Sequence, residues 1–274
     1  MSPYKAVIFD IGGVVLRSPF IGIAAYEKAH GLPPNYLNCS IVGRGSQGAW
    51  QRFERGELPF SNFYEAFGRD LSDVANGNEW YKAYCVKKAL SCPPLPTSLN
   101  IDGRELFGAM MREAQTYDPH IRNALLRIRA TGRWKVIALT NNFQKAEVPE
   151  SEREFLGWTK GATPDHLLAL FDDFCDSSTL GMRKPEPEFY LAACSRNNLD
   201  PHEAIFLDDI GMYATPELVT VLVIEFSFSN LKAAKRLGMD TIHVPIGGTL
   251  EAVKQLGAKL GIDLVNSADE QPKL

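Results

Sequence analysis

Short apolar segments that end in polar residues recur along this chain, and stretches with helical spacing separate them. Lys5–Asp10 is a near-continuous apolar run, which is expected of a parallel strand buried on both faces. Trp134–Thr140, Ala204–Asp209 and Thr241–Pro245 have the same character, and Phe171–Asp176 is a weaker fifth candidate. A sheet built from such strands needs helices on both of its faces.

The stretches between the strands can supply those helices. Pro119–Thr131 places apolar residues at helical spacing and stops before Gly132, and Pro187–Asn197 and Asn230–Leu237 also have helical patterns. Alternation of strands and helices predicts an α/β fold, here a doubly wound, Rossmann-like domain with a parallel sheet.

A long insertion follows the first strand. About 100 residues separate it from the next convincing strand, and within them Gly48–Gly56 and Phe60–Asp70 are amphipathic at helical spacing. The 274-residue chain also exceeds the length that one hydrophobic core usually serves. We therefore expect a smaller helical cap domain at residues 17–115, inserted into a core made of residues 1–16 and 116–274.

Charge and cysteine content exclude several classes of protein. The net charge of −4 gives no indication of a nucleic-acid or anionic-membrane partner, either of which would favour a basic face. Val219–Ile224, the longest apolar run outside the first strand, is too short to cross a bilayer, and the N-terminus has no signal-peptide pattern. The five cysteines are odd in number and include no Cys-x-x-Cys, which favours a reducing compartment. These features predict a cytoplasmic protein without nucleic-acid or membrane partners, and they leave its oligomeric state open.

Polar residues stand at the ends of three of the expected strands. Asp10 ends the first, Thr140 and Asn141 end the second, and Asp208 and Asp209 end another. Any one of these residues alone is more often part of a turn or a helix cap. Because ligands bind at the carboxyl ends of the strands in open α/β sheets, their joint occurrence predicts one shared site.

The segments around these residues resemble the four motifs of the haloacid dehalogenase superfamily. Val7–Val15 resembles the first motif and Leu139–Asn142 the second. Gly181–Tyr190, which contains Lys184, resembles the third, and Phe206–Gly211 resembles the fourth. They occur in the family's order, with the cap between the first two motifs as in members that carry a C1 cap.

Within the cap, Gly45–Glu57 is similar to the phosphatase-like N-terminal domain of soluble epoxide hydrolases. The resemblance implies a phosphomonoester phosphatase in which the Asp10 carboxylate attacks phosphorus and forms an aspartyl-phosphate. Thr140 and Asn141 would bind the phosphate group of a small substrate. Lys184 would bind it too, and would stabilise the charge of the transition state.

The same resemblance implies a Mg²⁺ cofactor. Its ligands would be Asp10, the backbone carbonyl of Gly12, and Asp209, with Asp208 as a less certain partner. Oxygen ligands of this kind suit Mg²⁺.

Two features depart from the family pattern. Active phosphatases of the family usually carry a second Asp two residues after the nucleophile, where this chain has Gly12, and loss of such an acid/base group typically lowers rates on the order of 10²–10⁴-fold. Met212–Ser229 also separates the fourth motif from the Asn230-Leu-Lys sequence that normally lies close behind it. Its β-prone, apolar composition indicates an unusual insertion, which we interpret as translated non-coding sequence.

Two other functions stay open at this point. A non-enzymatic phosphate-sensing or partner-binding protein on the same fold would accommodate Gly12 and the insertion. A metal-free 2-haloacid dehalogenase would also use an Asp nucleophile, but it would not need the acids of the fourth motif as metal ligands. The physiological substrate cannot be read from the sequence.

Overall fold

The structure is a computed structural model that describes residues 3–143, 148–158, 163–209, 230–245 and 248–265. The insertion expected at Met212–Ser229 lies outside the described residues. In the part of the chain that is described, no helix is long and apolar enough to cross a membrane.

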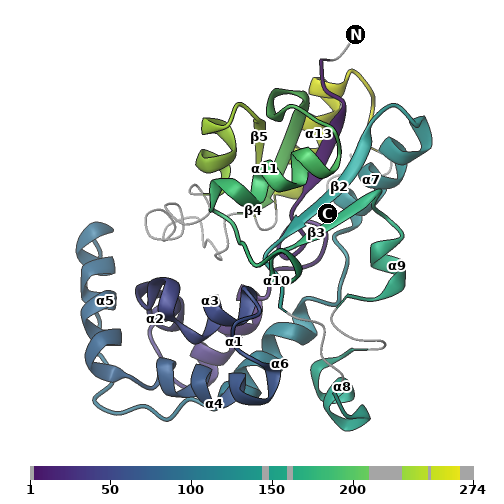
Figure 1. Cartoon of the computed structure of the whole chain (residues 1–274). Coiled ribbons are helices and arrows are strands. Elements are labelled where there is room, and N and C mark those ends of the chain that lie inside the picture. The colour runs from purple at the N-terminus through teal and green to yellow at the C-terminus, as the bar shows by residue number, and fades with distance from the viewer. Residues whose placement is uncertain (1–2, 144–147, 159–162, 210–229, 246–247, 266–274) are drawn as a thin grey trace, which may run out of the picture.

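A five-stranded parallel sheet forms the core domain, in the order β3-β2-β1-β4-β5 (Figure 1). The strands are β1 (Ala6–Phe9), β2 (Lys135–Thr140), β3 (Asp173–Asp176), β4 (Ala204–Asp209) and β5 (Asp240–Val244). All five expected strands are therefore confirmed, and so is the doubly wound α/β architecture. β2 and β3 lie on one side of β1 in the sheet, and the later strands β4 and β5 lie on the other. The strand order thus reverses direction between β1 and β4, which makes this position a topological switch point.

Helices cover both faces of the sheet. Val7 and Phe9 of β1 pack into one hydrophobic cluster with α7 (Pro119–Thr131) and α13 (Thr249–Leu260). On the opposite face, Ala6 and Ile8 pack against α11 (Pro187–Arg196) and the helix at residues 230–236. Because successive side chains of a strand point to opposite faces, the apolar run of β1 serves both clusters.

Helices also form most of the chain between β1 and α7. They are α1 (Phe20–Ala29), α2 (Tyr36–Gly43), the short η1 (Gly45–Gln47), α3 (Ala49–Glu54), α4 (Phe60–Leu71), α5 (Val74–Lys87) and α6 (Gly103–Glu113). These helices lie beyond the carboxyl ends of the strands, where they make a layer of their own (Figure 1). Its hydrophobic cluster is rich in aromatic rings. The rings of Phe53 and Phe63, for example, are stacked with their centroids 3.9 Å apart.

The segment after β2 follows a strand of the core domain in sequence, but it packs against the helical layer. Phe143, Leu156 and Trp158 come after β2, yet all three are buried in the aromatic cluster of the helical layer. Leu156 belongs to α8 (Glu150–Leu156), which contacts α6. The remaining short helices, α9 (Asp165–Leu168), α10 (Ser177–Leu180) and η2 (Pro201–Glu203), connect strands of the core.

Candidate active site

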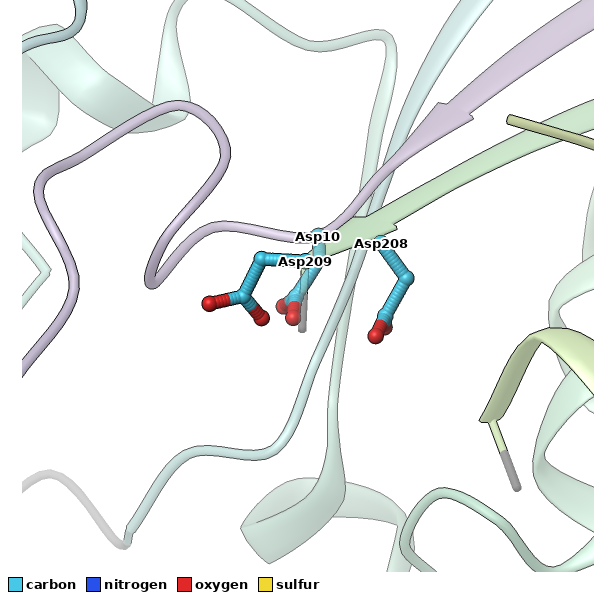
Figure 2. A group of neighbouring side chains, drawn as sticks. All are labelled: Asp10, Asp208 and Asp209. Atoms are coloured by element: carbon cyan, nitrogen blue, oxygen red, sulfur yellow. The ribbon is translucent and has the colours of Figure 1, made fainter. Parts of the chain in front are cut away.

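Three carboxylates meet at the carboxyl ends of β1 and β4. Asp10 comes directly after β1, and Asp208 and Asp209 end β4, which lies next to β1 in the sheet. Each offers an oxygen atom within 4.8 Å of the others, and all three residues are buried (Figure 2). The parallel register of the two neighbouring strands thus brings together acids that lie about 200 positions apart in the sequence.

Lys184 reaches two of these carboxylates from the loop before α11. Its Nζ lies 2.8 Å from Oδ2 of Asp10 and 2.7 Å from Oδ2 of Asp208. Only 1% of the residue is exposed. Burial alone would lower the pKa of Lys184, but the negative charges of Asp10 and Asp208 outweigh it and raise the pKa above its ordinary value. Lys184 therefore stays positively charged beside the proposed nucleophile.

Asp208 is held behind this lysine. The side-chain amide of Asn230 donates to both of its oxygens, at 3.2 and 3.3 Å. Burial raises the pKa of Asp208 to about 7, although Lys184 opposes the shift. The ion pair with Lys184 makes Asp208 a residue that positions this lysine, and the hydrogen bonds from Asn230 hold Asn230 beside the site.

Asp209 has an unsatisfied oxygen. Among the described residues, Oδ2 of Asp209 has no hydrogen-bond partner, although the atom is buried. Burial raises the pKa of Asp209 well above its ordinary range, and the charges of Asp208 and Asp10 add to the shift. A bound cation would lower the pKa of Asp209 again and favour its ionised form.

Gly13 lies against Asp209, a contact that sequence reasoning missed. Its φ of +90° is a conformation that few side chains tolerate, and a Cβ atom there would stand 1.9 Å from Oδ2 of Asp209. Only glycine therefore allows the loop after β1 to approach this carboxylate. The Gly-Gly pair in the sequence was the available signal.

The side-chain amide of Asn141 binds the backbone of Lys184, and the residue also lines the cavity described below. Its Oδ1 accepts a hydrogen bond from the backbone N–H of Lys184 at 2.7 Å, and its Nδ2 donates to the Lys184 carbonyl at 3.0 Å. This side chain thus fixes the loop that carries Lys184. Thr140 is a buried residue that lines the same cavity together with Asp10.

That cavity, of about 150 Å³, lies between the core and the helical layer. We define its core wall as the residues contributed by the strand ends, by the loops attached to them and by the start of the helix at residues 230–236: Asp10, Gly12, Thr140, Asn141, Arg183, Lys184, Asp209 and Asn230. We define its cap wall as the residues of the segment 19–110: Pro19, Phe20, Ile23, Asn38, Ile41, Val42, Trp50, Gln51, Glu54 and Met110. The core wall is polar and charged and does not include Asp208, whereas the cap wall is mainly apolar.

A buried ion pair joins the two walls, and sequence reasoning did not foresee it. Nε and Nη2 of Arg183 lie 2.9 and 2.6 Å from Oε2 of Glu54, the last residue of α3. The backbone carbonyl of Glu54 also lies 2.6 Å from Oγ of Ser177 in the core. The only sequence signal for this pair is that Arg183 adjoins Lys184.

The profile of one protein family matches most of this chain. Residues 4–212 match the haloacid dehalogenase-like hydrolases. The matched range contains all four motifs, which supply every residue of the core wall except Asn230.

Three curated relatives are similar to nearly the whole chain. Acyl-CoA dehydrogenase family member 10 of Mus musculus is 31% identical over 95% of this chain and 20% of its own length. Bifunctional epoxide hydrolase 2 of Sus scrofa is 25% identical over 88% of this chain and 40% of its own length. A sesquiterpene phosphatase of Aspergillus oryzae is 21% identical over 88% of this chain and 90% of its own length. The chain thus spans only a fifth to two-fifths of the first two proteins.

Proposed function

We propose that this chain, which belongs to the haloacid dehalogenase-like hydrolases, is a Mg²⁺-dependent phosphatase that cleaves phosphomonoesters through an aspartyl-phosphate on Asp10. The observation that carries the proposal is the position of Lys184, whose ammonium group lies between Asp10 and Asp208 at hydrogen-bond distance from both. A fixed positive charge beside a buried carboxylate suits attack on a dianionic phosphate, because it offsets the repulsion between nucleophile and substrate.

Asp10 is the group best placed to be the nucleophile. Its Oδ1 accepts a hydrogen bond from the backbone N–H of Ile11 at 2.6 Å, while Oδ2 contacts Lys184. These contacts orient the carboxylate at the end of β1. Attack through one oxygen would give the aspartyl-phosphate, with Lys184 and the hydroxyl group of Thr140 holding phosphate oxygens.

The residues present fit a divalent cation. Asp10 and Asp209 offer carboxylate oxygens within 4.8 Å of one another, and the unpartnered Oδ2 of Asp209 suits an oxygen-liganded ion. Gly12, whose backbone carbonyl would be the third ligand, lines the same cavity. When bound, Mg²⁺ supplies charge stabilisation for the transferring phosphoryl group.

The cap wall favours an apolar group on the substrate. Phe20, Ile23, Ile41 and Val42 line the cavity opposite the strand ends, and apolar surface of this kind binds alkyl or aromatic groups. We therefore propose a small phosphate ester with an apolar organic part. The name of the Aspergillus oryzae relative, a phosphatase of sesquiterpenes, agrees with this substrate class.

Hydrolysis of p-nitrophenyl phosphate, measured with Mg²⁺ and with excess EDTA, tests the proposed function. We expect turnover with Mg²⁺ and its loss on chelation. A chlorinated carboxylic acid, assayed in parallel for chloride release, provides the contrast. Chloride release that persists in EDTA, without phosphate release, would instead identify a metal-free dehalogenase.

A further inference from the structure

One carboxyl group of the cap wall has no role in the proposed phosphoryl transfer. Among the described residues, three carboxyl groups line the cavity, and they belong to Asp10, Asp209 and Glu54. Asp10 is the proposed nucleophile and Asp209 a proposed metal ligand. Glu54 is the one that remains.

The described loop after β1 lacks an acid/base side chain that phosphoester cleavage needs. An ester with a poor leaving group requires an acid that protonates the departing oxygen, and hydrolysis of the intermediate requires a base for the attacking water. Gly12 stands where the acid/base side chain would be expected in the loop after β1. Gly12 and Glu54 both line the main cavity and also a neighbouring cavity of about 90 Å³, so they border the same space.

The surroundings of Glu54 suit proton transfer. The two hydrogen bonds from Arg183 both go to Oε2 of Glu54. Together these contacts fix the orientation of the side chain. Burial raises the pKa of Glu54 above its ordinary value, and the positive charge of Arg183 opposes the shift. This shift favours the protonated form, which a general acid must have before it donates its proton.

We propose that Glu54, supplied by the cap, is the general acid and base of the reaction, in place of the side chain that Gly12 lacks. This inference rests on the proposed phosphatase function. It makes the cap a source of a catalytic group, in addition to its contribution to the cavity wall.

The two steps balance in atoms and charge. First, an oxygen of Asp10 bonds to phosphorus while the bond from phosphorus to the ester oxygen breaks, and the protonated Glu54 gives its proton to that oxygen. The products are an alcohol, the aspartyl-phosphate and ionised Glu54. Next, Glu54 takes a proton from water as the water oxygen attacks phosphorus. This step releases inorganic phosphate, frees the Asp10 carboxylate and restores protonated Glu54.

Two esters of similar shape test the first step. For p-nitrophenyl phosphate the leaving group needs little acid assistance, whereas for p-methoxyphenyl phosphate it needs much more. In Glu54→Gln with Mg²⁺, we expect kcat/KM to fall about 10²–10⁴-fold on the methoxy ester and less than about 10-fold on the nitro ester. Glu57→Gln, an exposed glutamate three positions away, is the matched control and should behave as wild type on both.

A second pair of variants separates acid/base catalysis from the ion pair. Arg183→Gln breaks the ion pair between Arg183 and Glu54 but keeps the Glu54 carboxyl group. The fall in kcat/KM should therefore be similar on the two esters. Glu54→Gln/Arg183→Gln leaves no unpaired buried charge and should still show the larger loss on the methoxy ester. Adding Gly12→Asp to Glu54→Gln should restore much of that loss. The Cβ introduced at position 12 would meet only the Pro19 ring, at 3.4 Å and beyond.

The second step has a readout that does not depend on turnover. In Glu54→Gln mixed with p-nitrophenyl phosphate, we expect the aspartyl-phosphate to accumulate, and intact-protein mass spectrometry after acid quenching detects it. An equal loss on both esters, or a loss that Gly12→Asp does not repair, overturns the role of Glu54. Failure of wild type to hydrolyse either ester overturns the phosphatase function itself, and this inference with it.

Discussion

The two walls of the cavity are built on different principles. The core wall brings charged groups together at the ends of neighbouring strands, and its lysine is paired with two carboxylates. The cap wall is a surface of apolar side chains that contains one carboxyl group, that of Glu54. Arg183 and Lys184 are consecutive in sequence, yet the first binds Glu54 of the cap wall and the second binds Asp10 of the core wall.

This contrast separates two properties of the enzyme. Under the proposed function, changes in the core wall should affect every phosphate ester, because every ester would present the same phosphate group to it. Changes in the cap wall should depend on the rest of the substrate. Variants of Asp10, Asp209, Gly13 and Phe20 test that division, from the largest expected effect to the smallest.

Asp10→Asn should lower kcat on p-nitrophenyl phosphate by about 10³-fold or more, because the amide has nearly the same shape but is a poor nucleophile. The same loss is expected on every ester, whatever its organic part. Circular dichroism and thermal melting should show an intact fold. Turnover at the wild-type rate would contradict the assignment of the nucleophile.

Asp209→Asn should remove the response to Mg²⁺. In wild type, Mg²⁺ should raise Tm, since a ligand that binds only the folded state adds about 2.7 kcal/mol of stability at one hundred times its Kd. In the variant this shift should disappear, while Tm without Mg²⁺ should rise, because the amide ends the repulsion from Asp10 and Asp208. Equal Mg²⁺-induced shifts in the two proteins would exclude Asp209 as a ligand.

Gly13→Ala tests the close approach of the loop to Asp209. We expect a loss of about 1–3 kcal/mol in the free energy of unfolding, together with weaker Mg²⁺ binding, measured by denaturant titration and by calorimetry. Gly132→Ala is the matched control, since Gly132 also has a positive φ, of +62°, but has no atom within 4 Å of the added Cβ. Similar Mg²⁺ affinity in both variants would show that backbone strain, rather than the contact with Asp209, causes the effect.

Phe20→Ala tests the cap wall. Phe20 begins α1 and is only half-buried, so its loss should leave the fold intact. We expect KM for an alkyl phosphate with a long chain to rise about 10-fold, because less apolar surface is buried against the chain. The KM for methyl phosphate should hardly change. Equal increases for both esters would argue against substrate selection by the cap wall.

The sequence by itself predicted the core of this protein well. Each strand could be located because burial on both faces leaves a continuous apolar run, as in Lys5–Asp10. The meeting of Asp10, Thr140 and Asp209 could also be predicted, since the carboxyl ends of parallel strands lie at one edge of a sheet. These are consequences of local pattern and topology. The sequence therefore contained enough information to place the proposed nucleophile and the neighbouring carboxylates at one edge of the sheet.

In the helical layer, the sequence pattern predicted fewer of the elements. Only α3 and α4 were foreseen there, because their apolar residues have a clear helical period. The buried face of α1 includes Gly22 and Glu27, and six consecutive residues of α2 are buried, so the apolar residues of neither helix follow a clear helical period. The domain boundaries at residues 16/17 and 115/116 stay a proposal. Burial of Phe143 and Trp158 in the aromatic cluster shows that the later chain also contributes to the cap layer.

Only the tertiary structure decided how the polar side chains are paired. The sequence did not predict that the side-chain amide of Asn141 binds the backbone of Lys184. Glu54 and Arg183 lie 129 positions apart, and nothing in the spacing of either residue predicts that they meet. The physical reason is that a strand or helix arises from a periodic pattern of neighbours in sequence, whereas the partner of a buried charge depends on which distant segments the packed core brings within hydrogen-bond reach.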